Sequence, residues 1–454
     1  MDSLMDGIRF TFSGKKMVGK PGDTIATALL RNGVRTFDRS IKLRRRRGPN
    51  CLEGYCMSCL LEVDGYRDVL SCRTKLENGM EIRPQIAWPT PKIDLLAPFQ
   101  NLANNLIGYD GIYHLFTSPP WARAAWLRTL SYASGRGKLN INQKPQCVPP
   151  FIDLSTDVLV IGAGVAGVAS ALEAASMGLQ VLIVDRGQKP GGWWKKWLSV
   201  GWPPPSLEPL DVPLSSLPKE VKHLKGTTLV GLYSDNSGIA VNQRAAYRIH
   251  FQTAIIAVGC YPNLVSFPGS DMPLYMPVQG LIRAWSESNW SPSSVVLLDF
   301  DRLGTELSGI LHTFGTEVIT IPMPNNEAYP EGIVGMNSLQ ECKVKMKQDG
   351  VLSGEAICWS RGWRPRLELI RQIGGYTYYD SMQDLFAPSL NDHVFVTENI
   401  LAAGGCAGIA GFSSSHRHGQ LAGAAAASIV KPATGLIRFR ELNKLWENHR
   451  GGHG

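Results

Sequence analysis

The amino-acid sequence predicts an α/β protein of several domains, and three observations lead to this prediction. Residues 157–187 contain two apolar runs separated by a glycine-rich turn and a helix of small residues, which is the pattern of a βαβ unit. Residues 295–321 repeat that pattern in a modified form. The first 83 residues instead contain alternating apolar and polar side chains and four closely spaced cysteines, which indicates a small separate domain.

Length and composition are those of an ordinary multidomain α/β protein. A chain of 454 residues is long enough for two or three domains. Much of the net charge of +8 comes from Lys42 and Arg44 to Arg47, so this charge does not indicate a nucleic-acid partner. No apolar run reaches the roughly 18 residues of a membrane span, and the N-terminus lacks the basic and apolar regions of a signal peptide. We therefore expect a cytoplasmic protein without a membrane span.

The chain opens with a pattern typical of a β-grasp domain. Apolar and polar side chains alternate through residues 8–20 on both sides of Ser13-Gly14, which predicts a β-hairpin. The next residues, Pro21 to Thr24, predict the cap of an amphipathic helix from Ile25 to Asn32, which Gly33 ends.

Four cysteines follow at the spacing C-x4-C-x2-C-x12-C, namely Cys51, Cys56, Cys59 and Cys72. A 2Fe-2S cluster needs four thiolates, and a C-x4-C-x2-C loop with a distant fourth cysteine suits it. A zinc site is the alternative, but zinc more often uses paired C-x2-C motifs. We therefore predict that residues 1–83 form a 2Fe-2S domain. The other cysteines are scattered singly, and we expect buried thiols there.

Two segments beside the cysteines have no clear regular pattern. Arg44 to Arg47 are equally compatible with a solvated basic turn and with binding to an anionic cluster or a nucleotide phosphate. Residues 84–150 are rich in proline and aromatic residues, so we expect a connector that packs across domains or against another chain.

The glycines of the first βαβ unit indicate a nucleotide-binding turn. Gly162 permits a tight turn, Gly164 lets the backbone approach a pyrophosphate, and Gly167 lets the helix pack closely on the strand. The N-terminus of the helix then points N–H groups at the phosphates. Asp185 ends the second strand, where a carboxylate can accept hydrogen bonds from ribose hydroxyls. The pattern leaves FAD, NAD and ATP open as the bound nucleotide.

A strand meander is predicted for residues 227–252, followed by an apolar strand that ends at Gly259. In two-domain flavoproteins such a strand passes the nucleotide, so Gly259 is a candidate cofactor-binding residue. The next domain, residues 293–385, repeats the βαβ pattern with acidic and bulky residues, including Asp299 and Asp301, in place of the glycines. These would obstruct and repel a pyrophosphate, so we do not expect NAD(P)H to bind there.

The first nucleotide-binding domain comprises residues 151–292 and 386–454 in this prediction. It closes with a helix of small residues from about His418 to Ile429, whose N-terminus could point at a cofactor. In glutathione-reductase-type flavoproteins an aspartate at the position of Gly405 holds the flavin ribityl chain, and Gly405 is our second candidate beside Gly259. His416 and His418 would either reach a flavin or serve as surface or capping residues.

Several segments resemble the alpha subunits of heteromeric sarcosine oxidases and the related subunits of dye-linked proline dehydrogenases, hydrogen cyanide synthase and opine oxidases. The segments are GDTIATALLRNGVRTFDRSIKLRRRRGPN, TTLVGLYSDN, SRGWRPRLEL and AAGGCAGIAGFSSSHRHGQLAGAAAA. The resemblance implies a glutathione-reductase-like flavoprotein fold with two dinucleotide-binding domains, here joined to an N-terminal β-grasp 2Fe-2S domain. It also implies that Gly162, Gly164, Gly167 and Asp185 bind the nucleotide and that the four cysteines bind the cluster.

The resemblance further implies an electron-transferring subunit of a flavin-dependent amine or amino-acid dehydrogenase or oxidase. A flavoprotein beta subunit of the D-amino-acid-oxidase type would oxidise the substrate, and electrons would pass through a flavin and the cluster to an unidentified acceptor. The implied cofactors are the 2Fe-2S cluster, a nucleotide at the glycine turn, with FAD expected and NAD or ATP as alternatives, and FMN at a subunit interface. Two alternatives stay open: a stand-alone FAD-dependent NAD(P)H-ferredoxin-type reductase, and a nucleotide-binding structural scaffold. The sequence identifies no catalytic residue.

Overall fold

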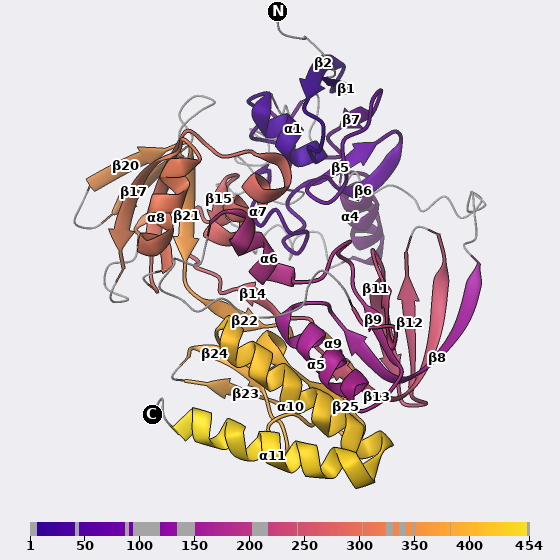
Figure 1. Cartoon of the computed structure of the whole chain (residues 1–454). Coiled ribbons are helices and arrows are strands. Elements are labelled where there is room, and N and C mark those ends of the chain that lie inside the picture. The colour runs from indigo at the N-terminus through magenta and orange to yellow at the C-terminus, as the bar shows by residue number, and fades with distance from the viewer. Residues whose placement is uncertain are drawn as a thin grey trace, which may run out of the picture. The chain divides into compact units, whose positions relative to one another are not determined.

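The computed structural model describes residues 7–40, 45–86, 90–93, 119–133, 150–201, 217–242, 244–301, 303–323, 330–335, 342–346, 350–381 and 383–451. The chain forms two compact units, each built from two separate stretches of sequence. Unit 1 combines residues 1–143 with 264–362, and unit 2 combines residues 144–263 with 363–454. Helices and strands alternate through both units, which confirms the predicted α/β class (Figure 1).

Unit 1 contains a five-stranded mixed sheet of order β2-β1-β7-β5-β6. The predicted hairpin is present, and Ser13 and Gly14 turn it with φ angles of 49° and 80°. The strands are β1 (Ile8–Phe12), β2 (Lys15–Gly19), β5 (Leu60–Val63), β6 (Tyr66–Leu70) and β7 (Glu81–Arg83). Because β7 pairs in parallel with β1 while the other pairs are antiparallel, this is the predicted β-grasp arrangement.

Helix α1 (Ile25–Arg31) begins at the predicted position because two threonines form a capping box. Thr24 accepts a hydrogen bond from the Thr27 amide at 3.2 Å, and Thr27 accepts one from the Thr24 amide at 2.9 Å. Residues 25–30 are all buried, so this short helix is held mainly by packing.

The second part of unit 1 is a four-stranded parallel sheet of order β15-β21-β16-β17 with two helices. These elements are β15 (Tyr275–Pro277), α7 (Val278–Ser288), β16 (Ser294–Asp299), α8 (Leu303–Thr313), β17 (Glu317–Pro322) and β21 (Ala356–Ser360). The succession β16, α8, β17 confirms the second predicted βαβ unit, since β16 and β17 are parallel neighbours.

The remaining elements of unit 1 are smaller. They are the pair β3 (Asp38–Arg39) and β4 (Arg46–Arg47), the antiparallel strands β18 (Gly332–Gly335), β19 (Cys342–Met346) and β20 (Gly350–Gly354), and helix α4 (Pro120–Ala133). Helix α4 belongs to the predicted connector, residues 84–150, most of which lies outside the described residues. The packing expected of that connector stays a prediction.

Unit 2 is organised around a seven-stranded sheet. Its parallel core is β10 (Val221–Leu224), β9 (Val181–Val184), β8 (Phe151–Ile161), β13 (Ala246–Ile256) and β25 (Ile400–Ala402). The beginning of β13 also pairs with β12 (Ser237–Val241), and β11 (Thr228–Tyr233) follows β12, so the predicted meander is confirmed. Past β13, Gly259 has a φ of 76° at the point where the chain enters β14 (Cys260–Pro262).

Helices α5 (Val165–Ser176) and α10 (Phe412–Val430) pack on one face of this sheet, and α11 (Pro432–Gly451) packs on α10 (Figure 1). Helix α10 begins six residues before the predicted His418, since the intervening serines continue the helix. Close packing of α5 and α10 requires glycine. A Cβ at Gly419 would lie 2.3 Å from the Ala166 carbonyl oxygen, and one at Gly423 would lie 2.5 Å from that of Ser170.

The opposite face of the sheet carries a second core. Alternate residues of the same strands, such as Leu159 and Ile256, pack there against Leu232 of β11 and Ile370 of α9 (Glu368–Gln372). Two short antiparallel pairs complete unit 2: β14 with β22 (Trp363–Pro365), and β23 (Thr377–Asp380) with β24 (Leu385–Pro388). None of the described helices is long and apolar enough to cross a membrane.

Replacing Gly423 by alanine is expected to destabilise unit 2 by about 1–3 kcal/mol, because the new methyl group overlaps the Ser170 carbonyl oxygen of α5. Thermal unfolding followed by circular dichroism measures the change. Gly309→Ala is the matched control, since Gly309 is an exposed helical glycine whose Cβ would meet no atom within 4 Å. This control should stabilise its helix by about 0.5–1 kcal/mol. Equal effects of the two changes would contradict the packing argument.

Candidate cofactor sites

The four predicted cluster cysteines lie together in unit 1. Cys51, Cys56 and Cys59 belong to the loop between β4 and β5, and Cys72 follows β6. Three of them are buried, with 1% to 2% of their surface exposed, while Cys56 is partly exposed. The site is therefore enclosed by protein except near Cys56 and its neighbour Met57, whose side chain is 56% exposed.

The thiols form two pairs. A hydrogen bond with Cys51 lowers the pKa of Cys56 to about 5, and a hydrogen bond with Cys72 lowers the pKa of Cys59. Burial raises the pKa of Cys51, and the bond with Cys59 raises that of Cys72. Each pair thus contains one sulfur that favours the thiolate form, which is the form that binds metal.

This donor set suits a 2Fe-2S cluster better than zinc. The cluster needs two thiolates on each of two irons, whereas a structural zinc needs four donors around a single ion. The pairing of Cys51 with Cys56 and of Cys59 with Cys72 offers two thiols to each of two irons, as the predicted cluster needs.

The backbone of the cysteine loop turns its amides towards sulfur. Leu52, Gly54 and Met57 all have positive φ, at 50°, 84° and 55°. As a result the amides of Glu53 and Cys56 donate to Cys51 Sγ at 3.3 and 3.4 Å. Such hydrogen bonds stabilise negative charge on sulfur and are one of the ways in which a protein sets a cluster's reduction potential.

The glycine turn of unit 2 has the geometry that the sequence predicts. Gly162 has a φ of 107°, and a Cβ there would lie 2.4 Å from the Ala257 carbonyl oxygen. A Cβ at Gly167 would lie 1.9 Å from the Gly162 carbonyl oxygen, so helix and turn are in backbone contact. In contrast, a Cβ at Gly164, the N-cap of α5, would meet no atom within 4 Å. The turn is therefore open where a phosphate would approach the helix N-terminus.

A second glycine pair lies over this turn, and the sequence analysis did not assign it a role. Gly191 donates its amide to the Ala163 carbonyl oxygen at 2.8 Å, and a Cβ at Gly192 would lie 3.1 Å from Gly164 Cα. Gly192 begins helix α6 (Gly192–Ser199), so its backbone is held beside the turn. The signal in the sequence was a Gly-Gly pair shortly after Asp185.

Asp185 lies at the end of β9 and is tied to the turn. One carboxylate oxygen accepts from the Ala163 amide at 2.8 Å, and the other accepts from the Gly187 amide. A carboxylate has about four acceptor positions. These two bonds orient Asp185 and leave capacity for the expected ribose hydroxyls.

The two other candidate glycines differ in their surroundings. A Cβ at Gly259 would meet no atom within 4 Å, so this position is open. Gly405 lies in a 3-10 turn, Gly404–Ala407, where a Cβ would lie 3.0 Å from Cys260 Sγ. An aspartate at 405, as in glutathione-reductase-type flavoproteins, would crowd Cys260. Only glycine therefore leaves enough room for the Cys260 side chain opposite this position.

His418 is neither at the surface nor directed at an open site. Its side chain is fully buried, Nδ1 accepts from the Gly404 amide at 3.1 Å, and Nε2 lies 3.0 Å from the His393 carbonyl oxygen. Since Nδ1 accepts, the ring is neutral and Nε2 donates. His418 therefore orients the turn that carries Gly405, which the sequence could not show because the contacts join a helix, a 3-10 turn and a loop whose packing is not local.

In the second βαβ unit, the chain's own carboxylates fill the turn. Asp299 is buried and accepts from the amides of Gly304 and Thr305 at 3.1 and 2.7 Å, at the N-terminus of α8. Asp301 accepts from the Ser360 hydroxyl at 2.6 Å and from the Gly362 amide. A negative charge thus already occupies the N-terminus of the helix, which supports the expectation that no NAD(P)H pyrophosphate binds there.

Two protein families match parts of this chain. Residues 6–86 match the 2Fe-2S iron-sulfur cluster binding domain, and residues 156–325 match the pyridine nucleotide-disulphide oxidoreductase family. The sarcosine oxidase subunit alpha of Rhizobium meliloti (strain 1021) is 30% identical over 338 residues, which are 69% of this chain and 34% of that protein. That of Corynebacterium sp. (strain P-1) is 23% identical over 62% of this chain and 26% of that protein. The chain therefore spans about a third of the length of the first relative.

Among solved structures, L-proline dehydrogenase from P. horikoshii matches 97% of this chain and 78% of its own with a TM-score of 0.69 and 17% sequence identity. Together with the two family matches, this likeness confirms the predicted fold, a dinucleotide-binding flavoprotein fold joined to an N-terminal 2Fe-2S domain.

Replacing Cys56 by serine is expected to remove the visible absorption of the cluster and to reduce bound iron from two per chain to nearly none, because one of the paired thiolates is lost. Iron and sulfide assays on anaerobically purified protein measure this. Cys260→Ser is the control, since Cys260 belongs to unit 2 and is not one of the four proposed ligands, and it should keep both irons. A Cys56→Ser protein with an unchanged spectrum would refute the ligand assignment.

Gly164→Val is expected to leave the fold intact, because its side chain enters open space, and to lower nucleotide affinity by about tenfold or more, equal to about 1.4 kcal/mol. Nucleotide released by acid and quantified per folded chain is the measurement. Asp299→Asn, in the second turn, should leave that content unchanged. Full nucleotide content in Gly164→Val would show that the phosphates bind elsewhere.

Proposed function

Since the chain belongs to the family of proteins related to sarcosine oxidase alpha subunits and carries a 2Fe-2S domain, we propose that it is an electron-transferring subunit of a flavin-dependent amine or amino-acid dehydrogenase or oxidase. The observation that carries this proposal is the presence, in one chain, of two thiol pairs and an open glycine turn. The relation to these oxidases also indicates that the substrate, which donates the electrons, carries a CH-NH group.

In this proposal Cys51, Cys56, Cys59 and Cys72 hold the cluster, and the loop amides donate to Cys51 Sγ. The glycine turn of Gly162, Gly164 and Gly167 holds the pyrophosphate of FAD, and Asp185 holds its ribose. When bound, the flavin takes up an electron pair and the cluster carries single electrons, which is the chemistry that neither thiols nor glycines can supply. The protein itself positions both groups and limits the access of water to three of the four sulfurs.

The proposal includes a separate catalytic chain. A flavoprotein beta subunit of the D-amino-acid-oxidase type would remove hydride from the substrate, and FMN would bind between the subunits. These parts rest on the family relation alone. A cytoplasmic location also belongs to the proposal, because four free thiols that must receive a cluster need a reducing compartment.

The first alternative is a self-contained NAD(P)H-ferredoxin-type reductase. It requires a second nucleotide site, and in the second βαβ unit Asp299 and Asp301 already accept from the amides at the start of α8 that would bind one. This observation favours the relay subunit over the reductase.

The second alternative is a structural scaffold whose nucleotide has no redox role. The replacement of the ribityl-binding aspartate by Gly405, which contacts Cys260, is compatible with it. The scaffold would bind NAD or ATP at the turn as readily as FAD.

Anaerobic purification of the chain, followed by acid release and mass spectrometry of its small molecules, is expected to give FAD with two irons and two sulfides per chain. NADH should not bleach the visible spectrum, since the second turn is closed. Bleaching by NADH would establish the reductase instead. NAD or ATP together with iron and sulfide would exclude FAD from the turn and favour the scaffold.

A further inference from the structure

Helix α7 follows β15 in the second stretch of unit 1, residues 264–362, and packs against the cysteine loop. A Cβ at Gly280 would lie 2.8 Å from the Cys51 carbonyl oxygen and 3.4 Å from that of Asn50, so the helix backbone packs directly against the loop. Three residues further along α7, Arg283 lines the same small hollow as Cys72 and Leu52. The cluster site therefore includes side chains from outside the β-grasp domain.

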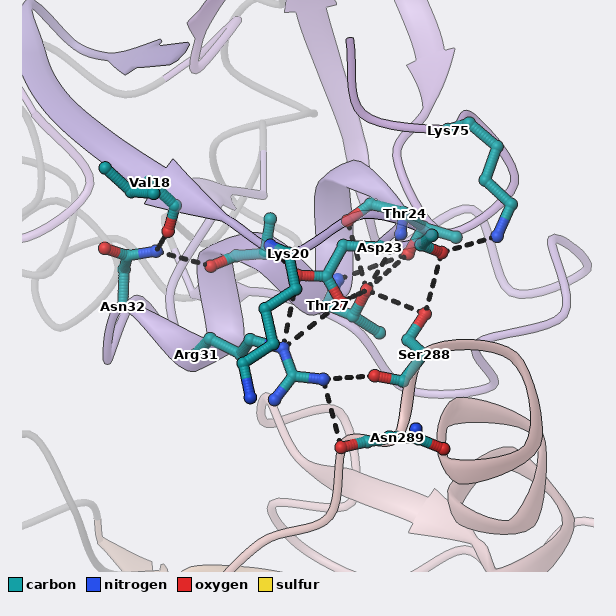
Figure 2. A network of polar contacts seen from close by, with 12 residues as sticks. Val18, Lys20, Asp23, Thr24, Thr27, Arg31, Asn32, Lys75, Ser288 and Asn289 are labelled. Carbon is teal, nitrogen blue, oxygen red and sulfur yellow. Dashed lines mark hydrogen bonds and ion pairs between the residues drawn. The ribbon is translucent and has the colours of Figure 1, made fainter. Parts of the chain in front are cut away.

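The other end of α7 is fastened to the β-grasp domain by a network of polar contacts, shown in Figure 2. Thr27 donates to the Ser288 hydroxyl at 3.2 Å, and Arg31 donates to the carbonyl oxygens of Ser288 and Asn289. Asp23, which is buried, pairs with Arg31 at 3.2 Å and holds its guanidinium in place. These contacts fix α7 along its length, and with it the position of Arg283.

Arg283 is a buried cation with two acidic partners. Its side chain is 5% exposed and lies 3.4 Å from Glu53 Oε1, whose side chain is 4% exposed. It also pairs with Glu287 at 3.1 Å, but Glu287 is 31% exposed. Glu53 belongs to the cysteine loop itself, so a buried pair of opposite charges stands beside the thiols. Buried charges are screened weakly by salt, and their fields act strongly at short range.

We propose that Arg283 and Glu53 together set the reduction potential of the bound cluster, and that residues 264–362 serve the cluster in this way instead of binding a second nucleotide. This inference rests on the proposed function, because it requires the four cysteines to hold a cluster. The reduced cluster carries one more negative charge than the oxidised one. Arg283 therefore stabilises the reduced form and raises the potential, while Glu53 lowers it.

The test is a potentiometric titration of the full chain with its cluster, followed through the electron paramagnetic resonance signal of the reduced form. One electron from the mediator enters the cluster, and no bond forms or breaks. Arg283→Gln should lower the potential, because Glu53 then stays buried without its counter-charge. Glu53→Gln should raise it, and Glu287→Gln should raise it less because solvent screens that carboxylate.

Two further variants separate charge from packing. Arg283→Lys keeps the positive charge, so its reduction potential should stay close to that of the wild-type protein. Arg83→Gln removes an exposed arginine that pairs with Glu81 and should leave the potential unchanged. The change in reduction potential caused by Arg283→Gln should persist at high salt, because the Arg283 side chain is buried and salt screens buried charges weakly.

The inference would be overturned if Arg283→Gln and Glu53→Gln shifted the reduction potential in the same direction. It would also be overturned if neither variant shifted the potential while both kept their full iron and sulfide content. If Arg283→Gln does not fold, the two glutamate variants alone still decide the sign and the ranking. A wild-type chain that binds no iron would instead refute the cluster assignment, and the inference with it.

Discussion

The close contact between the glycine turn and helix α5 is the constraint on which unit 2 depends. Gly167 lies against the Gly162 carbonyl oxygen, where no side chain fits, and this brings α5 onto β8 and β13. Helix α10 packs on α5 through glycines of its own, Gly419 and Gly423, because a Cβ at either would overlap the α5 backbone. The same contact leaves Gly164 facing open space at the helix N-terminus. One packing requirement thus shapes both the hydrophobic core and the proposed nucleotide site.

Unit 1 shows what the same βαβ topology does when aspartates, Asp299 and Asp301, replace the first two glycines of the turn. In β16 and α8 the strand and helix are retained, but Asp299 accepts the amides at the start of the helix. A buried carboxylate there satisfies the N-H groups that a pyrophosphate would otherwise bind. The two βαβ units therefore differ in which groups occupy the amides at the turn, while their parallel strands are paired alike.

The cysteine loop combines local and distant constraints. Its positive φ angles at Leu52, Gly54 and Met57 are local and turn amides towards Cys51. The helix that packs against it, α7, comes from more than two hundred residues further along the chain, and Gly280 is what permits the approach. The buried charges beside the thiols consequently include Arg283 as well as Glu53, and the cysteine segment alone could not reveal the arginine.

The sequence by itself determined the features that depend on neighbouring residues: the hairpin at Ser13-Gly14, the threonine cap of α1, the glycine turn and the two βαβ units. It also determined the type of metal donor, because the spacing of the cysteines selects a cluster loop. Only the tertiary structure decided how the thiols pair, that His418 is a core residue holding the Gly404 turn, and that Gly405 contacts Cys260. The physical reason is that these contacts depend on how loops, turns and helices pack in three dimensions, and local propensity carries no information about that packing.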